Sequence, residues 1–105
     1  MLLLLTLPAV VQAQYYYTDD GWSITITGYY GPGGAVVIPA TINGLPVTRI
    51  EDGAFAHRFS LTSVTIGNSV TSIGNSAFAY CTSLTNATIW NGVTSVPLRN
   101  KSWTG

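Results

Sequence analysis

The sequence repeats itself every 23 residues over residues 47–96, and this repetition constrains the fold more than any other feature. When residues 47–75 are aligned with residues 70–98, 15 of the 29 pairs are identical. Phe55 aligns with Phe78, so each copy carries one bulky aromatic residue that we expect to fill its core. Self-similarity at this spacing is typical of a solenoid, in which each coil stacks on the previous one. The pattern predicts two full coils and a partial third.

Each copy contains two short apolar strands separated by turns. Residues 61–66 and 84–89 share an L-x-x-(V/A)-x-I pattern, which predicts strands that pair in parallel and in register. A second strand is expected at 70–73, and residues 76–81 contain helix formers behind a Ser or Asn cap, which predicts one or two helical turns. The fold class is therefore a β-rich α/β solenoid. The residues expected to point into the coil are Leu61, Val64, Ile66, Val70, Ile73, Leu84, Ala87 and Ile89.

Residues 14–46 have a different composition, rich in aromatic residues and glycine. Segments 15–17 and 22–27 flank an Asp-Gly dipeptide, a strong signal for a β-hairpin turn. Residues 35–38 predict another strand, and Asn43-Gly44 predicts a second tight turn. Because the end of a solenoid has to be covered, we interpret 14–46 as an N-terminal β cap and lead-in.

Three segments resemble the BspA-like leucine-rich repeat family. They are residues 38–48, 50–66 and 73–84, and the last contains the unusual A-F-x-x-C-x-x-L spacing. The resemblance covers about residues 22–96. It implies leucine-rich repeat coils of about 23 residues. It also implies an exported or cell-surface protein with a role in adhesion or host contact, and no enzymatic activity in the repeats.

Two departures from the family pattern have consequences. Arg58 stands where the family usually has cysteine, so only the second coil carries it, at Cys81. After Val96 the pattern is lost, and residues 97–105 are interpreted as a degenerate tail at a truncation or gene-model error. The partial third coil would then leave an open edge, through which the chain is expected to associate with itself.

Residues 1–13 resemble a secretory signal peptide. An apolar run is followed by small residues at Val11 and Ala13, the −3 and −1 positions of a cleavage site, although no basic residue precedes the run. A buried strand or helix is the alternative. The run is too short to span a bilayer, so no transmembrane span is expected. The predicted location is secreted or cell surface.

The composition excludes several kinds of chemistry. Only 8% of residues are charged and the net charge is zero, so nucleic-acid binding is not expected. The single histidine, His57, lies at a variable repeat position without a nucleophile motif, and Asp19-Asp20 fits turn chemistry better than calcium. Cys81 is either a buried hydrophobe or a reactive thiol. We therefore predict a non-enzymatic chain with no catalytic residue, cofactor or metal.

The predicted function is binding of an extracellular protein or glycan, with adhesion at the cell surface. The alternatives are a structural repeat fragment without a ligand, or the non-catalytic part of a larger secreted enzyme. A secondary aromatic patch is expected at Tyr80 and Trp90, near His57 and Phe59, unless Trp90 packs against a following coil. The candidate ligand-binding residues on the outward strand face are Thr62, Ser63, Thr65, Thr85, Asn86 and Thr88.

Overall fold

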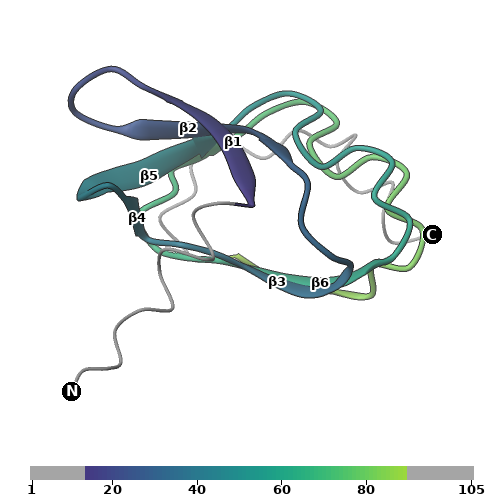
Figure 1. The fold of residues 1–105 in the computed structure, drawn as a ribbon. Coiled ribbons are helices and arrows are strands. Elements are labelled where there is room, and N and C mark those ends of the chain that lie inside the picture. Colours follow the sequence, from purple (N-terminus) through teal and green to yellow (C-terminus); the bar gives the residue numbers. More distant parts are fainter. Residues whose placement is uncertain (1–13, 90–105) are drawn as a thin grey trace.

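The computed structural model describes residues 14–89, which form two facing β-sheets joined by turns (Figure 1). One sheet has the order β1-β2-β5-β4, with β7 also paired to β5, and the other has the order β3-β6-β8. The strands are β1 (Tyr15–Asp19), β2 (Ile24–Tyr29), β3 (Gly34–Ile38), β4 (Thr41–Ile42), β5 (Leu45–Ile50), β6 (Leu61–Ile66), β7 (Ser72–Ile73) and β8 (Asn86–Ile89).

The repeated segments stack in parallel, as the sequence predicts. In one sheet β5 pairs with β7, with Ile50 opposite Ile73, and in the other β6 pairs with β8, with Ile66 opposite Ile89. In both cases the partner residue lies one sequence repeat further along the chain. The two sheets therefore form opposite sides of a winding chain, and each turn of the winding lies on the previous one (Figure 1).

The N-terminal segment contributes strands to both sheets. The predicted hairpin is confirmed as β1 paired antiparallel with β2, and the predicted strand over 35–38 as β3. Strand β2 also pairs in parallel with β5, and β3 pairs in parallel with β6. The predicted tight turn joins β4 to β5, with left-handed φ values of 51° at Asn43 and 81° at Gly44. Residues 14–46 thus supply strands to the stack as well as a hairpin at its end.

The helical turns predicted over residues 76–81 are absent, and the described residues contain no helix. The segments 51–58 and 74–81 form consecutive tight turns instead. An α-helix requires each amide to donate to the carbonyl four residues back. Here the amides of Ala54, Ala56 and Arg58 donate three residues back, to Glu51, Gly53 and Phe55. The alternate amides of Gly53, Phe55 and His57 donate to the next coil, to the carbonyls of Asn75, Ala77 and Ala79 at 3.0, 2.7 and 2.8 Å.

The core runs along the axis of the stack as a column of rings. Phe55 and Phe78 are both buried, and their rings are stacked with centroids 5.0 Å apart and 17° between planes. Tyr29 continues the column, 5.3 Å from Phe55. Aliphatic side chains from both sheets and from the adjoining turns surround the rings, including the predicted inward residues Leu61, Val64, Ile66, Val70, Ile73 and Leu84. Burying one such ring contributes about 1.5–3 kcal/mol.

Several sequence predictions fall outside residues 14–89. These are the signal peptide at 1–13, the remainder of the partial third coil, Trp90, and the degenerate tail at 97–105. They stay predictions, as do the domain boundaries that depend on them. Among the residues that are described, no helix is long and apolar enough to cross a membrane.

Candidate functional site

The outward face of the β3-β6-β8 sheet brings four of the six predicted ligand-binding residues into two rows. Ser63 lies opposite Asn86, and Thr65 lies opposite Thr88. These rows form because Val64 and Ile66 are buried, so the intervening residues of β6 point outward. Neighbouring strands in a sheet lie about 4.8 Å apart, which sets the spacing within each row.

Strand β3 extends both rows by one position. Ala35 lies opposite Ser63, and Val37 lies opposite Thr65 with 61% of its side chain exposed. The rows are therefore Ala35–Ser63–Asn86 and Val37–Thr65–Thr88. None of these six side chains carries a charge, so the face offers hydroxyl, amide and methyl groups only.

Thr62 and Thr85 are predicted site residues that do not join these rows. The register between β3 and β6 shifts so that Gly34 pairs with Leu61 and Ala35 with Ser63, which leaves Thr62 without an opposite residue. Thr85 precedes β8, and its amide and hydroxyl both donate to the Thr62 carbonyl, at 3.0 and 3.5 Å. Both residues are exposed, but their contacts fasten one coil to the next.

The predicted aromatic patch is present in part, at the turn stack. Tyr80 is 59% exposed and lies flat on His57, with ring centroids 4.7 Å apart and 12° between planes. Phe59, 58% exposed, meets His57 edge-on at 5.9 Å. His57 and Tyr80 both have positive φ values, 65° and 61°, because they occupy equivalent positions in successive coils. Trp90, the other predicted member, lies outside the described residues.

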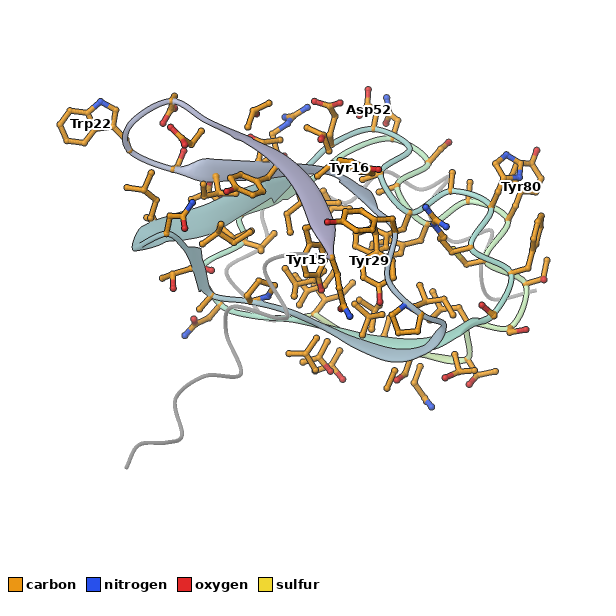
Figure 2. All side chains as sticks on the ribbon, viewed as in Figure 1. Tyr15, Tyr16, Trp22, Tyr29, Asp52 and Tyr80 are labelled. Carbon is orange, nitrogen blue, oxygen red and sulfur yellow. The ribbon has the colours of Figure 1, made fainter. Side chains whose placement is uncertain are left out.

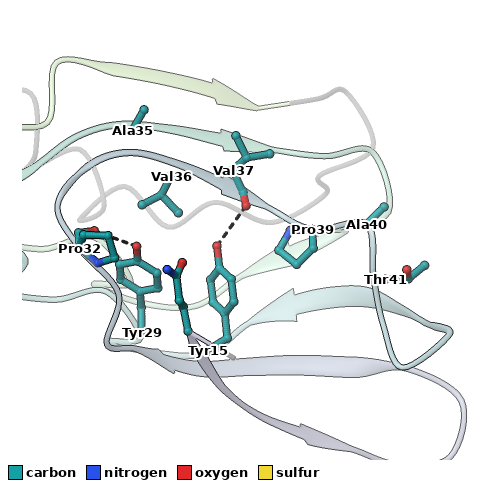
Figure 3. Close-up of a pocket in the computed structure, with 10 residues that line it drawn as sticks. Tyr15, Tyr29, Pro32, Ala35, Val36, Val37, Pro39, Ala40 and Thr41 are labelled. Carbon is teal, nitrogen blue, oxygen red and sulfur yellow. Dashed lines mark hydrogen bonds between the residues drawn. The ribbon is translucent and has the colours of Figure 1, made fainter. Parts of the chain in front are cut away.

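An apolar cavity of about 550 Å³ opens at the N-terminal end of the stack, and the sequence analysis did not predict it (Figure 3). Its lining includes Tyr15, Tyr29, Pro32, Val36, Val37 and Pro39. The Tyr15 hydroxyl donates to the Val37 carbonyl at 3.0 Å, and the Tyr29 hydroxyl donates to the Pro32 carbonyl at 2.8 Å. Burial raises the pKa of both tyrosines, and the neighbouring Tyr29 adds to the effect at Tyr15. The run of three tyrosines at 15–17 was the available signal for an aromatic wall.

The polar and reactive side chains have structural contacts. Asp20 accepts hydrogen bonds from the amides of Trp22 and Ser23, both at 2.8 Å, and these bonds lower its pKa. This is the predicted turn chemistry. Cys81 is fully buried and its thiol donates to the Phe55 carbonyl at 3.1 Å. Burial raises the pKa of that thiol, which disfavours the reactive thiolate.

Over residues 14–89, no three His, Cys, Asp or Glu side chains gather closely enough to hold a metal ion. What the described residues do offer is an ordered, uncharged surface on one sheet, an exposed aromatic stack on the turns, and an apolar groove at one end. Such surfaces are suited to binding.

Comparison with protein families identifies the repeat. The model of the BspA type leucine rich repeat region matches residues 38–99. Among curated proteins, none matches the sequence.

Three solved structures share the fold at substantial identity. A leucine rich repeat protein of Treponema pallidum has a TM-score of 0.73 and 40% identity, over 77% of this chain and 39% of that one. A leucine rich cell surface protein of Faecalibacterium prausnitzii A2-165 has a TM-score of 0.64 and 38% identity, over 75% and 22% of the two chains. A leucine-rich repeat protein of Bacteroides capillosus has a TM-score of 0.65 and 33% identity, over 71% and 60%. The present chain thus spans less than two thirds of the length of each.

Proposed function

Because this chain belongs to the BspA-type leucine-rich repeat family, we propose that it is the non-catalytic binding module of an exported bacterial protein. It contacts an extracellular protein or glycan through the outward face of the β3-β6-β8 sheet, and its role is adhesion at the cell surface. The observation that carries this proposal is the pair of in-register rows, in which Thr65 lies opposite Thr88 and Ser63 opposite Asn86.

The rows support binding because a stacked repeat separates fold from function. Inward residues such as Val64 form the core of the coil. The outward positions do not pack in that core, so their side chains can vary to contact a partner. Each further coil would lengthen the rows, so the face grows into an extended surface without any change in the core.

The chemistry of the face indicates a partner recognised by hydrogen bonding and shape. Its hydroxyl and amide groups can donate to and accept from sugar hydroxyls or a peptide backbone. Only 8% of the chain is charged, with no net charge, so no basic patch would release counterions on binding. We therefore expect an affinity that changes little between low and physiological salt.

Export is supported by two observations of different kinds. Residues 1–13 carry the pattern of a signal peptide with a cleavage site after Ala13, apart from the basic start. The Faecalibacterium relative is described as a cell surface protein. A free thiol that is buried, as Cys81 is, is compatible with an oxidising environment because it is protected from pairing.

Two alternative functions follow from the same family membership. The chain could be a structural spacer without a ligand, or part of a larger secreted enzyme whose catalytic domain lies elsewhere, since each solved relative is a longer chain. A further candidate partner is a second copy of the chain, which would pair through the C-terminal edge of the repeats. Sequencing the gene beyond Gly105 distinguishes the spacer from the enzyme, because only the enzyme requires a catalytic domain in the same gene.

The proposal is tested by presenting the chain from Gln14 onward to a glycan array and to immobilised extracellular-matrix proteins. The double substitution Thr65→Glu and Thr88→Glu places two carboxylates in the middle of the face and should abolish retention. Thr18→Glu, an exposed threonine on β1, is the matched control and should leave retention unchanged. If the wild type is retained and the double variant binds as well, the site lies elsewhere, and Tyr80→Ala tests the aromatic stack next.

A further inference from the structure

Beyond the sheet face, we propose a second binding site at the N-terminal end of the stack. There the open edge of β3 and the tyrosine-lined groove beside it take an uncharged, extended peptide segment of another protein, which pairs with β3 as an added strand. This inference is independent of the proposed function of the outward face, because it uses the edge of the sheet and not its surface.

The first observation is that β3 ends the sheet. In the order β3-β6-β8, and among the described residues, no strand lies on the side of β3 that faces away from β6. The edge of a strand presents backbone amides and carbonyls that can pair with an extended chain. Strand β3 is five residues long, or about 17 Å at the usual rise of a strand.

One hydrogen bond shows which backbone groups point outward along this edge. The carbonyl of Val37 accepts from the Tyr15 hydroxyl at 3.0 Å, so this carbonyl faces the groove. Along a strand the amide and carbonyl of one residue point to the same side, and residues two apart share that side. It follows that the amide of Val37 and the amide and carbonyl of Ala35 also face the groove. Gly34 lies outside this alternation, because its φ is left-handed, at 85°, and the register with β6 shifts between Gly34 and Ala35.

The second observation is the groove itself. Figure 3 shows the rings of Tyr15 and Tyr29 standing beside β3, with Pro32 at one end and Pro39 at the other. Both tyrosine rings are at least 96% buried and are fixed by their hydroxyl bonds to the β3 segment, so they form a rigid wall. The cavity volume of about 550 Å³ is sufficient for several small apolar side chains.

The lining decides the chemistry of the occupant. Every side chain that lines the groove is uncharged, and most are aromatic, aliphatic or proline. A charged side chain entering it would lose its water without gaining an ion pair, which is costly. An extended segment with apolar residues at alternate positions fits, because one set of side chains would enter the groove while its backbone pairs with Ala35 and Val37.

The chain itself provides a suitable probe. On its other edge β3 already pairs with the segment Leu61–Ile66, which carries no charge and has the apolar residues Val64 and Ile66 at alternate positions. We therefore choose the acetylated and amidated peptide LTSVTI as the added ligand, and the same peptide with Val64→Lys as the charged control.

The experiment follows the backbone amides of the full ¹⁵N-labelled chain during titration with each peptide. The proposal expects the amides of Ala35 and Val37 to shift and to gain at least tenfold protection from exchange, with no such change for the lysine peptide. Changes confined to β6 and β8 would overturn it. So would protection of these two amides before peptide is added, since the groove would then be filled from within the chain, or protection that rises with protein concentration alone, since the occupant would then be a second copy.

Two matched pairs separate pairing from general stickiness. Val37→Pro removes the outward amide but keeps the carbonyl that Tyr15 contacts, whereas Val37→Ala keeps both. We expect binding at least tenfold weaker for Val37→Pro than for Val37→Ala, which shortens the same side chain but keeps the amide. Two N-methylated peptides test the other partner. In one, the amides that would point toward β3 are methylated, and this peptide should lose binding. In the other, the amides that point away from β3 are methylated, and this peptide should bind like the parent. If both methylated peptides bind like the parent, the added strand is ruled out, even where Val37→Pro fails to fold.

Discussion

Two junctions in the molecule are held by the same kind of hydrogen bond, made with different side chains. One lies between the two repeat coils, and the other lies between the first coil and the N-terminal segment. Arg58 and Cys81 occupy equivalent repeat positions. Cys81 donates its thiol to the Phe55 carbonyl in the preceding coil at 3.1 Å, and Arg58 donates its guanidinium to the Tyr29 carbonyl in the preceding segment. The departure from the family's cysteine therefore keeps the function of the position, which is to satisfy a carbonyl of the previous layer.

The two junctions also differ in regularity, and this difference explains the choice of side chain. Between the coils, strand partners are 23 residues apart, as in Ile50 with Ile73. At the N-terminal junction the separation changes to 24 for Ile26 with Ile50 and to 28 for Val36 with Val64, and both ladders contain a register shift. A short thiol reaches its acceptor only where the layers stack regularly. The long side chain of Arg58 spans the irregular junction to the Tyr29 carbonyl. Within the N-terminal segment, the hydroxyls of Tyr15 and Tyr29, whose rings lie side by side in Figure 2, donate to the carbonyls of Val37 and Pro32.

The largest expected effect is on the regular junction. Phe78→Ala should lower the free energy of unfolding by about 3–5 kcal/mol, because it removes a buried ring from the stacked column and leaves a cavity. Phe59→Ala, at an exposed position, is the control and should cost less than about 0.5 kcal/mol. Denaturant titration measures both. A loss below about 1 kcal/mol for Phe78→Ala would mean that the ring does not fill the coil core.

The next effect is a loss of stability in alkali, to which Cys81 contributes first and the two tyrosines of the N-terminal segment contribute at higher pH. Burial raises the pKa of Tyr15 and Tyr29 above the ordinary value of 10.0, and that of Cys81 above 9.0. Groups with raised pKa values contribute their full stability below the unfolded pKa and lose it as the pH rises. Stability should be flat up to about pH 9 and fall above it. In Tyr15→Phe, the fall above pH 10 should be shallower. A profile equally steep in the variant would exclude Tyr15 as its source.

The smallest effect isolates one hydroxyl at the irregular junction. Tyr15→Phe at neutral pH keeps the buried ring but removes the donor to the Val37 carbonyl, which should cost about 1 kcal/mol. Tyr16→Phe removes a hydroxyl from a ring that is 59% exposed and should change nothing measurable. Equal melting temperatures for Tyr15→Phe and the wild type would show that the hydroxyl bond does not stabilise this end.

The predictable parts of the fold are those that depend on residue patterns along the sequence, namely strand alternation and the repeat. The alternation in Leu61–Ile66 gives the inward and outward residues, and the repeat gives the parallel register of β6 with β8. The turn stack was not predictable, because residues 76–81 contain helix formers, whereas the bonds that hold the tight turns join two coils. The amides of Phe55 and His57 donate to the carbonyls of Ala77 and Ala79. The pairing of β2 and β3 with the repeats was also missed, since neither segment shares the repeat's spacing.

The candidate site divides in the same way. Ser63, Thr65, Asn86 and Thr88 follow from strand alternation, which the sequence shows directly. Thr62 is exposed as predicted, but it has no opposite residue on β3, because the register shifts between Gly34 and Ala35 and no pattern in the sequence signals that shift. The groove forms because Tyr15 and Tyr29 lie beside β3. Only the tertiary fold brings these two tyrosines and β3 together.

The central claim is that successive coils stack in register and so build the outward rows. Backbone and side-chain nuclear Overhauser contacts between β6 and β8 in the isotope-labelled chain test it most directly. The account predicts contacts between Thr65 and Thr88 and between Ser63 and Asn86, and a parallel pattern of backbone contacts along both strands. An antiparallel pattern, or contacts of Thr65 with any residue of β8 other than Thr88 as its direct partner, would contradict the stacking and with it the proposed binding face.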